Sequence, residues 1–256
     1  MINIDVKKIE HVVWIKCGSI SDIYGCVYKG NIYIYKKYLE PDKIFDSNFN
    51  NRLDFLSKER FSQSLLPKYM VFENDEKVGY LTPKIDIKNI LRIEDPIVKY
   101  QALQSAKKAI QEIHKKDIIH GDIHPGNILV RNDKRCLIDF DNCDVTTSDR
   151  INMDFERCSM PAMEFINRNG IIKNLDIYMF NVLTFFAFNK LSSSGYIGDM
   201  FDTARSSIYF GKYGIFNKSD SRRICEDIYL YQSDKYLLDT ISEKDVDKYD
   251  KKLVYK

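Results

Sequence analysis

A short polar stretch carries the side chains with the clearest potential for chemistry. Asp122 and Asn127 flank a Pro-Gly turn, and Asp139 follows a short apolar run. Carboxylate and amide oxygens are hard ligands that suit Mg²⁺, which binds through a few such groups together with phosphate oxygens. A separate carboxylate near them could accept a proton from a hydroxyl group. Phosphoryl transfer requires this combination of metal ligands and a group that orients the nucleophile.

The spacing of these residues resembles the catalytic loop of the protein-kinase-like phosphotransferases. The kinase signature H-R-D-L-x-x-x-N places Asn five residues after Asp, and Asn127 stands five residues after Asp122, with a His in the first place. Asp139, Phe140 and Asp141 resemble the D-F-G element, with Asp in place of Gly. The resemblance implies that Asp122 is the catalytic base and that Asn127 and Asp139 hold Mg²⁺ beside ATP.

Two glycines upstream resemble the remains of a kinase Gly-rich loop. Gly25 and Val27 fit the end of that loop, x-F-G-x-V, and Gly18 is the other glycine left of the full G-x-G-x-x-G pattern. Such a loop lets backbone N–H groups approach phosphate oxygens. The resemblance assigns Gly18, Gly25 and Val27 to nucleotide binding through an altered loop. An ordinary hairpin glycine is the alternative.

A lysine after the next β-rich run fits the strand motif V-A-I-K, whose lysine pairs with the nucleotide α- and β-phosphates. Lys36 completes the motif, and the adjacent Lys37, which would point to the other face of the strand, is the alternative. The helix that follows should supply a carboxylate that orients this lysine. We expect Glu59 to do so, with Asp54 as the alternative, and a solvated helix charge explains either residue nearly as well.

Two downstream acids also match elements of the protein-kinase pattern. Ala162-Met163-Glu164 resembles A-P-E, and Asp176, twelve residues after Glu164, resembles the opening of D-x-W-x-x-G. The resemblance implies that Glu164 is structural and that Asp176 braces the catalytic loop from behind. A plain acid at the N-terminus of a helix, favoured there by the helix dipole, is the alternative for Asp176.

The elements that must position these residues change in type along the chain. Alternating β-rich runs bounded by turn residues predict five strands, and one helical pattern lies among them. The strands are expected at residues 11–17, 23–28, 32–38, 69–73 and 78–81, and the helix at 48–61. We expect the five strands to form one antiparallel sheet.

The remaining residues are predicted to be mainly helical. Helices are expected at 96–114, 175–190 and 219–231, with β-rich pieces at 128–130 and 136–140 and an irregular segment at 141–165. The composition shifts near residues 82–84. Strands followed by helices indicate an α+β chain, and the resemblance implies a two-lobe protein-kinase-like fold with a nucleotide-binding N-lobe at 1–83. The C-lobe at 84–256 should carry the catalytic loop, the metal site and the acceptor site.

Composition limits the other classes of function. The 256 residues include 39 Lys and Arg against 37 Asp and Glu, so net charge gives no case for nucleic-acid or membrane binding. The six cysteines form no C-x-x-C pair, which argues against a structural zinc site. No apolar stretch is long enough to span a bilayer, and no signal-peptide pattern is present, so we expect a cytoplasmic protein.

The resemblance implies an ATP- and Mg²⁺-dependent phosphotransferase with a hydroxyl acceptor. The segment around Glu164 and Asp176 favours a Ser/Thr protein kinase of an atypical, bacterial type. Gly121 and His124, however, make the catalytic loop closer to aminoglycoside and choline phosphotransferases, so a small-molecule acceptor is the alternative. The degenerate Gly-rich loop supports a third interpretation, a kinase-fold binding protein with little or no turnover.

Overall fold

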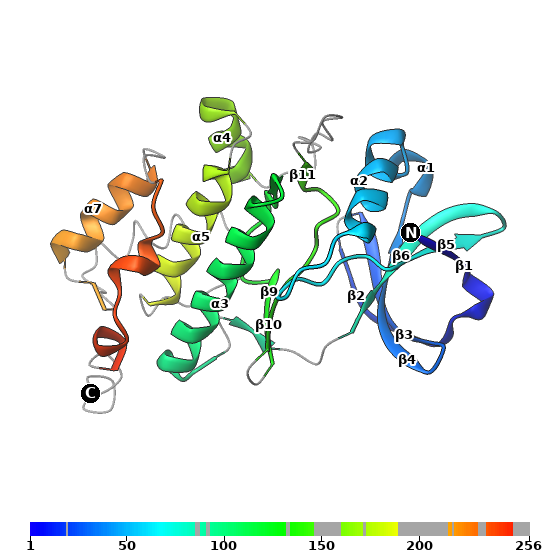
Figure 1. Cartoon of the computed structure of the whole chain (residues 1–256), viewed down its shortest axis with the longest axis horizontal. Coiled ribbons are helices and arrows are strands. Elements are labelled where there is room, and N and C mark those ends of the chain that lie inside the picture. The colour runs from blue at the N-terminus through cyan, green and yellow to red at the C-terminus, as the bar shows by residue number, and fades with distance from the viewer. Residues whose placement is uncertain are drawn as a thin grey trace.

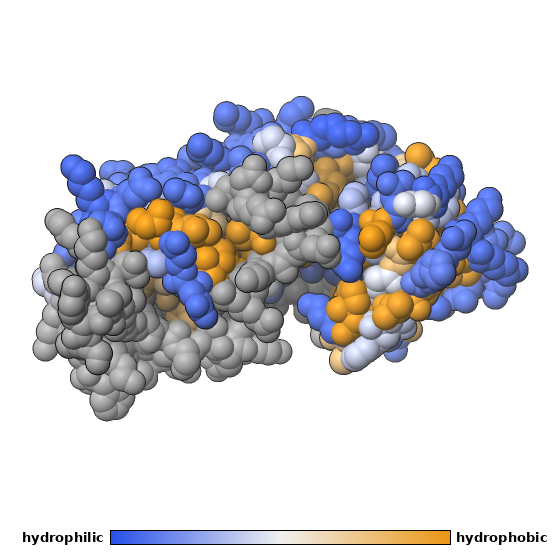
Figure 2. Space-filling model, turned by 90° about the horizontal axis from the view of Figure 1, so that it is seen from below, coloured by the Kyte–Doolittle hydropathy of each residue, from blue (hydrophilic) through white to orange (hydrophobic). Residues whose placement is uncertain are grey.

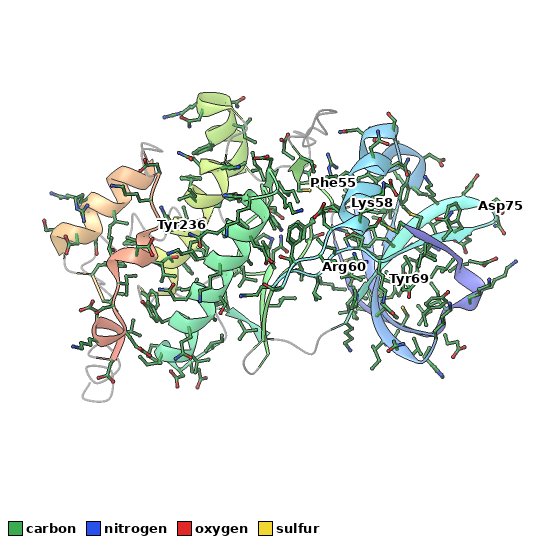
Figure 3. All side chains as sticks on the ribbon, in the orientation of Figure 1. Phe55, Lys58, Arg60, Tyr69, Asp75 and Tyr236 are labelled. Atoms are coloured by element: carbon green, nitrogen blue, oxygen red, sulfur yellow. The ribbon has the colours of Figure 1, made fainter. Side chains whose placement is uncertain are left out.

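The computed structural model of the chain describes residues 1–18, 20–84, 88–90, 93–131, 134–145, 160–170, 173–188, 215–216, 218–229 and 234–247. Most strands lie at one end of the molecule and most helices at the other (Figure 1). Tyr69 marks the strand-rich part and Tyr236 the helical part in Figure 3. The predicted α+β class is therefore confirmed.

The main sheet has six strands rather than the predicted five. Its strands are β1 (Ile2–Asp5), β2 (Glu10–Cys17), β3 (Ser21–Tyr28), β4 (Asn31–Tyr38), β5 (Tyr69–Glu73) and β6 (Glu76–Pro83), in the order β1-β5-β6-β4-β3-β2. The five predicted strands pair antiparallel, whereas β1 pairs parallel to β5, so the sheet is mixed. The prediction missed β1 because only Ile4 of its four residues is buried, which gives a weak alternation signal.

The two faces of the sheet carry different side chains because successive residues of a strand point in opposite directions. Tyr33 and Tyr35 of β4 lie on one face, in a buried cluster with Cys26 and Tyr28 of β3. Lys36 and Tyr38 lie on the other face. Helix α2 (Ser47–Lys58) covers part of this second face, where its Phe49 and Leu53 pack against Tyr38, Met70 and Tyr80.

Helix α2 also connects the sheet to the helical part. Asp46 caps its first turn by accepting a hydrogen bond from Phe49 N at 2.7 Å. Phe55 and Leu56, further along, belong to the core of the helical part, and Phe55 lies at the junction in Figure 3. The helix ends at Lys58, three residues earlier than predicted, because Glu59 has an extended backbone. A short helix, α1 (Pro41–Ile44), precedes it.

The helical part is built on two helices that the sequence predicts. These are α3 (Pro96–His114), capped by the Asp95 side chain, and α5 (Asn174–Ala187), most of which is buried. Helix α4 (Met160–Asn169) falls partly in the segment predicted to be irregular, and α7 (Lys218–Tyr229) and a 3₁₀ turn at Leu237–Thr240 follow. Within the described ranges, no helix combines the length and apolar composition that a membrane crossing requires.

Five short strands place two loops side by side. Strand β8 (Ile118–Ile119) pairs with β11 (Asp144–Val145), while β9 (Ile128–Arg131) pairs with β10 (Lys134–Leu137) and with β7 (Lys88–Asn89). The first loop, 120–127, joins β8 to β9, and the second, 138–143, joins β10 to β11. Because both ends of each loop are paired, the catalytic-loop residues and the D-F-D residues are brought together. Strand β10 ends at Leu137, before the predicted end at residue 140.

Candidate active site

The first loop is fixed from behind by a buried carboxylate of α5. Asp176 is fully buried, and its two oxygens accept hydrogen bonds from His120 N at 2.8 Å and Gly121 N at 2.7 Å. His114 Nε2 of α3 lies 2.8 Å from the same carboxylate. Gly121 has a φ of +75°, a left-handed conformation that favours glycine. The expectation that Asp176 braces this loop is therefore confirmed.

Three side chains of the first loop form a hydrogen-bonded group. Asn127 Nδ2 donates to the carbonyl oxygen of Asp122 at 3.0 Å and to its Oδ2 at 2.9 Å. His124 Nε2 lies 3.4 Å from the same Oδ2, and Gly126 N donates to His124 Nδ1 at 3.0 Å. Burial raises the pKa of Asp122, but the hydrogen bonds and charge around it outweigh this, so its pKa is lowered overall. The Asp122 carboxylate is thus ionised at neutral pH.

The second loop places Asp139 beside the first. Ile138 N donates to the carbonyl oxygen of Asn127 at 3.0 Å, and His120 Nε2 lies 2.8 Å from the carbonyl oxygen of Ile138. Asp139 follows with a φ of +68°, a left-handed conformation that is uncommon outside glycine. Burial raises the pKa of Asp139. The positive charge of Lys36 lowers this pKa, but by less, so it remains above its usual value.

Lys36 reaches this loop from the sheet. Its Nζ lies 2.7 Å from Asp139 Oδ1 and 2.8 Å from Asp141 Oδ2. Burial lowers the pKa of Lys36, but the two carboxylates outweigh this and raise it well above its usual value. Lys37 points to the opposite face, as strand alternation requires, and its Nζ lies 2.9 Å from Glu73 Oε2. Lys36 is therefore the lysine that the fold brings to the second loop.

Neither carboxylate expected from the helix reaches Lys36. Glu59 lies beyond the last turn of α2, and its Oε2 is 3.5 Å from Lys116 Nζ. Asp54 is on the exposed face, where it pairs with Lys58 at 2.6 Å and with the terminal amino group at 3.1 Å. The helix instead turns the buried Arg52 inward, and Arg52 Nη1 donates to the carbonyl oxygen of Asp141 at 2.7 Å. The prediction of Glu59 or Asp54 is therefore wrong.

The predicted glycines occupy different local structures. Gly18 lies at the turn after β2, where its N donates to Ser21 O at 2.7 Å. Gly25 lies within β3 rather than in the loop and pairs with Ile34 of β4. Val27 and Gly25 share the face of Lys36, because Ile23, two residues before Gly25, pairs directly with Lys36. The structure thus brings Gly25 and Val27 to the lysine face and leaves Gly18 at the turn.

A glycine that was not among the predicted site residues allows β6 to approach β4 closely at Lys36. A Cβ atom at Gly79 of β6 would lie 2.1 Å from the carbonyl oxygen of Lys36 and 2.9 Å from Tyr35 Cε2. Any side chain here would push β4 away from β6. The signal in the sequence was a glycine in the interior of a strand pattern, which often marks a close approach of another backbone.

The donor set of the two loops is suitable for Mg²⁺. Within the described part of the structure, both hydrogen bonds of the Asn127 side chain use Nδ2, so its Oδ1 could bind a cation. Asp139 adds a carboxylate, and both are hard oxygen ligands. The described residues contain no cluster of three His, Cys, Asp or Glu side chains that could hold a metal by itself. Mg²⁺ in nucleotide sites is usually bound by only one or two protein carboxylates together with phosphate oxygens.

Residues 85–147, which contain both loops, match the sequence model of the phosphotransferase enzyme family (APH). That family belongs to the protein-kinase-like superfamily. The match confirms the resemblance that the catalytic loop suggests. It covers the segment with both loops but not the sheet that carries Lys36. A comparison with curated proteins found no match.

Proposed function

We propose that the protein is an ATP-dependent phosphotransferase that moves the γ-phosphate of ATP to a hydroxyl group. The observation that carries the proposal is the position of Lys36 Nζ, 2.7 Å from Asp139 Oδ1 although the two residues are 103 positions apart in the chain. A phosphate-binding lysine and a metal-binding carboxylate must be neighbours in space to act on one nucleotide. The match of residues 85–147 to a phosphotransferase family supports the same activity.

Each residue of the two loops has a role in this proposal. Lys36 contacts the nucleotide phosphates, and Asn127 Oδ1 and Asp139 hold Mg²⁺, which neutralises charge that develops on the phosphates. Asp122 accepts the proton of the acceptor hydroxyl, and its lowered pKa keeps it in the ionised form that this role needs. Asp176 is a positioning residue that sets the backbone of the loop.

An apolar surface beside Lys36 suits the base of the nucleotide. Val13 pairs with Gly25 on this face and Ile32 pairs with Val27, and their side chains are 64% and 58% exposed. Ile15 lies here too, since a Cβ at Gly25 would contact its Cδ1 at 3.6 Å. Figure 2 shows hydrophobic side chains on the surface of the strand-rich part. We propose that residues 1–83 form a nucleotide-binding N-lobe and residues 84–256 a C-lobe.

We propose Ser or Thr of a protein as the first acceptor class. The arrangement that supports it is the bond from His120 N and Gly121 N to Asp176, which follows the protein-kinase pattern predicted from the sequence. Glu164, the other acid of that pattern, lies in α4, but its side chain is outside the described part of the structure.

A small-molecule hydroxyl is the second candidate acceptor. It is supported by the family match and by the two departures from protein kinases in the first loop, Gly121 and His124. His124 replaces a lysine there and is engaged with Asp122 rather than directed away from the loop.

The test is incubation of the protein with γ-labelled ATP and Mg²⁺, with protein, aminoglycoside and amino-sugar acceptors in parallel. Transfer of label to one acceptor class, lost when Mg²⁺ is chelated, is the expected result. Binding of MgATP with no transfer and no hydrolysis would indicate a kinase-fold binding protein. A protein that binds no nucleotide at all contradicts the proposal.

A further inference from the structure

The carboxylates that contact Lys36 come from the second loop, whereas a carboxylate from the helix was predicted. Lys36 Nζ has two acidic neighbours, Asp139 Oδ1 at 2.7 Å and Asp141 Oδ2 at 2.8 Å, and both belong to the second loop. Asp141 occupies the place of Gly in the D-F-G-like motif, so the motif supplies a second carboxylate instead of a flexible backbone position. Helix α2 directs Arg52 inward, toward the carbonyl oxygen of Asp141.

We propose that Asp141 is the positioning residue for Lys36, in place of a carboxylate from the helix. The inference rests on the proposed function, because it takes Lys36 to contact the phosphates of a bound nucleotide. It extends that function by adding a side chain at a place where the D-F-G motif of kinases has only a glycine.

The two neighbours of Lys36 become unequal once nucleotide and metal bind. Asp139 would hold Mg²⁺, and a carboxylate interacts more strongly with a divalent ion than with an ammonium group. Asp141 then remains as the carboxylate of Lys36. A lysine ammonium group has three N–H donors, so one bond to Asp141 leaves two for phosphate oxygens. Asp141 would therefore keep Lys36 directed at the phosphates while Asp139 holds the metal.

Asp141 is built rigidly enough for this role. It is only 4% exposed, and the Tyr38 hydroxyl donates to the same Oδ2 that faces Lys36. Tyr38 is two residues beyond Lys36 on β4, so one strand carries two partners of this oxygen. Arg52 Nη1 fixes the backbone of Asp141 from α2 at 2.7 Å. The sheet, the helix and the loop therefore determine the position of one carboxylate together.

The experiment measures binding of a ribose-labelled fluorescent ATP analogue with Mg²⁺ to wild type, Lys36→Met, Asp141→Asn and the double variant. Loss of a charged hydrogen bond predicts that Asp141→Asn weakens binding by about 10- to 100-fold. Because Asp141 acts through Lys36, the double variant should bind no more weakly than Lys36→Met alone. Glu73→Gln is the matched control: it removes the partner of Lys37, the adjacent lysine on the opposite face, and should change binding by less than about twofold.

The cycle separates positioning from mere stability. Normal affinity of Asp141→Asn beside a weakened Lys36→Met, or losses that multiply in the double variant, would overturn the inference, even if Asp141→Asn melts at a lower temperature. If Asp141→Asn does not fold, Tyr38→Phe replaces it in the same cycle, with an expected loss of about 2- to 10-fold, and multiplying losses again overturn the inference. A wild type that binds no analogue refutes the proposed function instead.

Discussion

Replacing Asp176 with Asn should lower both the stability of the protein and its rate of phosphate transfer, because the Asp176 carboxylate accepts hydrogen bonds from three donors. His120 N, Gly121 N and His114 Nε2 all lie within 2.8 Å of its oxygens, and the side chain is fully buried. Asn has nearly the same shape but only one acceptor oxygen. Its NH₂ group would face a buried N–H donor, which would lose its partner.

The cost follows from the bonds that are lost. A buried donor left without a partner costs about 1–3 kcal/mol, and more where the acceptor was charged. We expect the free energy of unfolding to fall by about 3 kcal/mol, which lowers Tm by about 6–12 °C in a chain of this size. A small displacement of catalytic groups can cost about 100-fold in rate, so kcat should fall by about that factor.

The assay combines thermal unfolding, followed by circular dichroism, with initial rates of phosphate transfer. Asp117→Asn is the control, because this exposed carboxylate pairs with Lys173, at 2.8 Å on the surface. Exposed pairs contribute about 0–1 kcal/mol, so the control should unfold and react like wild type. Equal Tm and kcat values for the two variants would refute the role given to Asp176.

Three further predictions concern the two loops and the sheet. Asp122→Ala should lower kcat by at least about 100-fold while changing the Kd of MgATP by less than about threefold, since the base acts on the acceptor; a collapse of binding with a normal residual rate would give Asp122 another role. His124→Gln should raise the pKa of Asp122, because the hydrogen bond and the charge of His124 lower it. The acid limb of the pH profile of kcat/KM should therefore move to higher pH. An acid limb at the wild-type pH would contradict the interaction between His124 and Asp122. Gly79→Ala should lower the free energy of unfolding by about 3 kcal/mol or more, since its Cβ would overlap the carbonyl oxygen of Lys36. Gly25→Ala should lower it less, because a Cβ at Gly25 would make only ordinary van der Waals contacts. A lower Tm for Gly25→Ala than for Gly79→Ala would contradict the packing.

The features that the sequence predicts well are set by neighbouring residues. The five-residue interval between Asp122 and Asn127 is a property of one turn, and the structure joins the two side chains by a 2.9 Å hydrogen bond. The alternation in β4 separates Lys36 from Lys37 on opposite faces, as a strand must. Helix α3 begins at Pro96 after the Asp95 cap, so both of its first residues signal a helix start.

The features that it misses depend on distant contacts. Glu59 fits the expected order along the chain, but the last turn of α2 ends before it, and the helix presents Arg52 inward instead. Nothing local to Asp141 indicates that Lys36, Tyr38 and Arg52 will converge on it from 89 or more residues away. Strand β1 is too short for a clear alternation and is defined by its parallel pairing with β5.

The central claim is that Asp139 and Lys36 belong to one Mg²⁺-dependent phosphotransfer site. The most direct test is the release or transfer of label from γ-labelled ATP by wild type, Asp139→Asn and the surface control Asp117→Asn, all purified alike and checked for equal folding. We predict turnover by wild type and Asp117→Asn that disappears when Mg²⁺ is chelated, and at least about a 1000-fold loss in Asp139→Asn, since removal of an essential transition-state group has effects of this order. Turnover by Asp139→Asn at the wild-type rate, with the same requirement for Mg²⁺, would contradict the account.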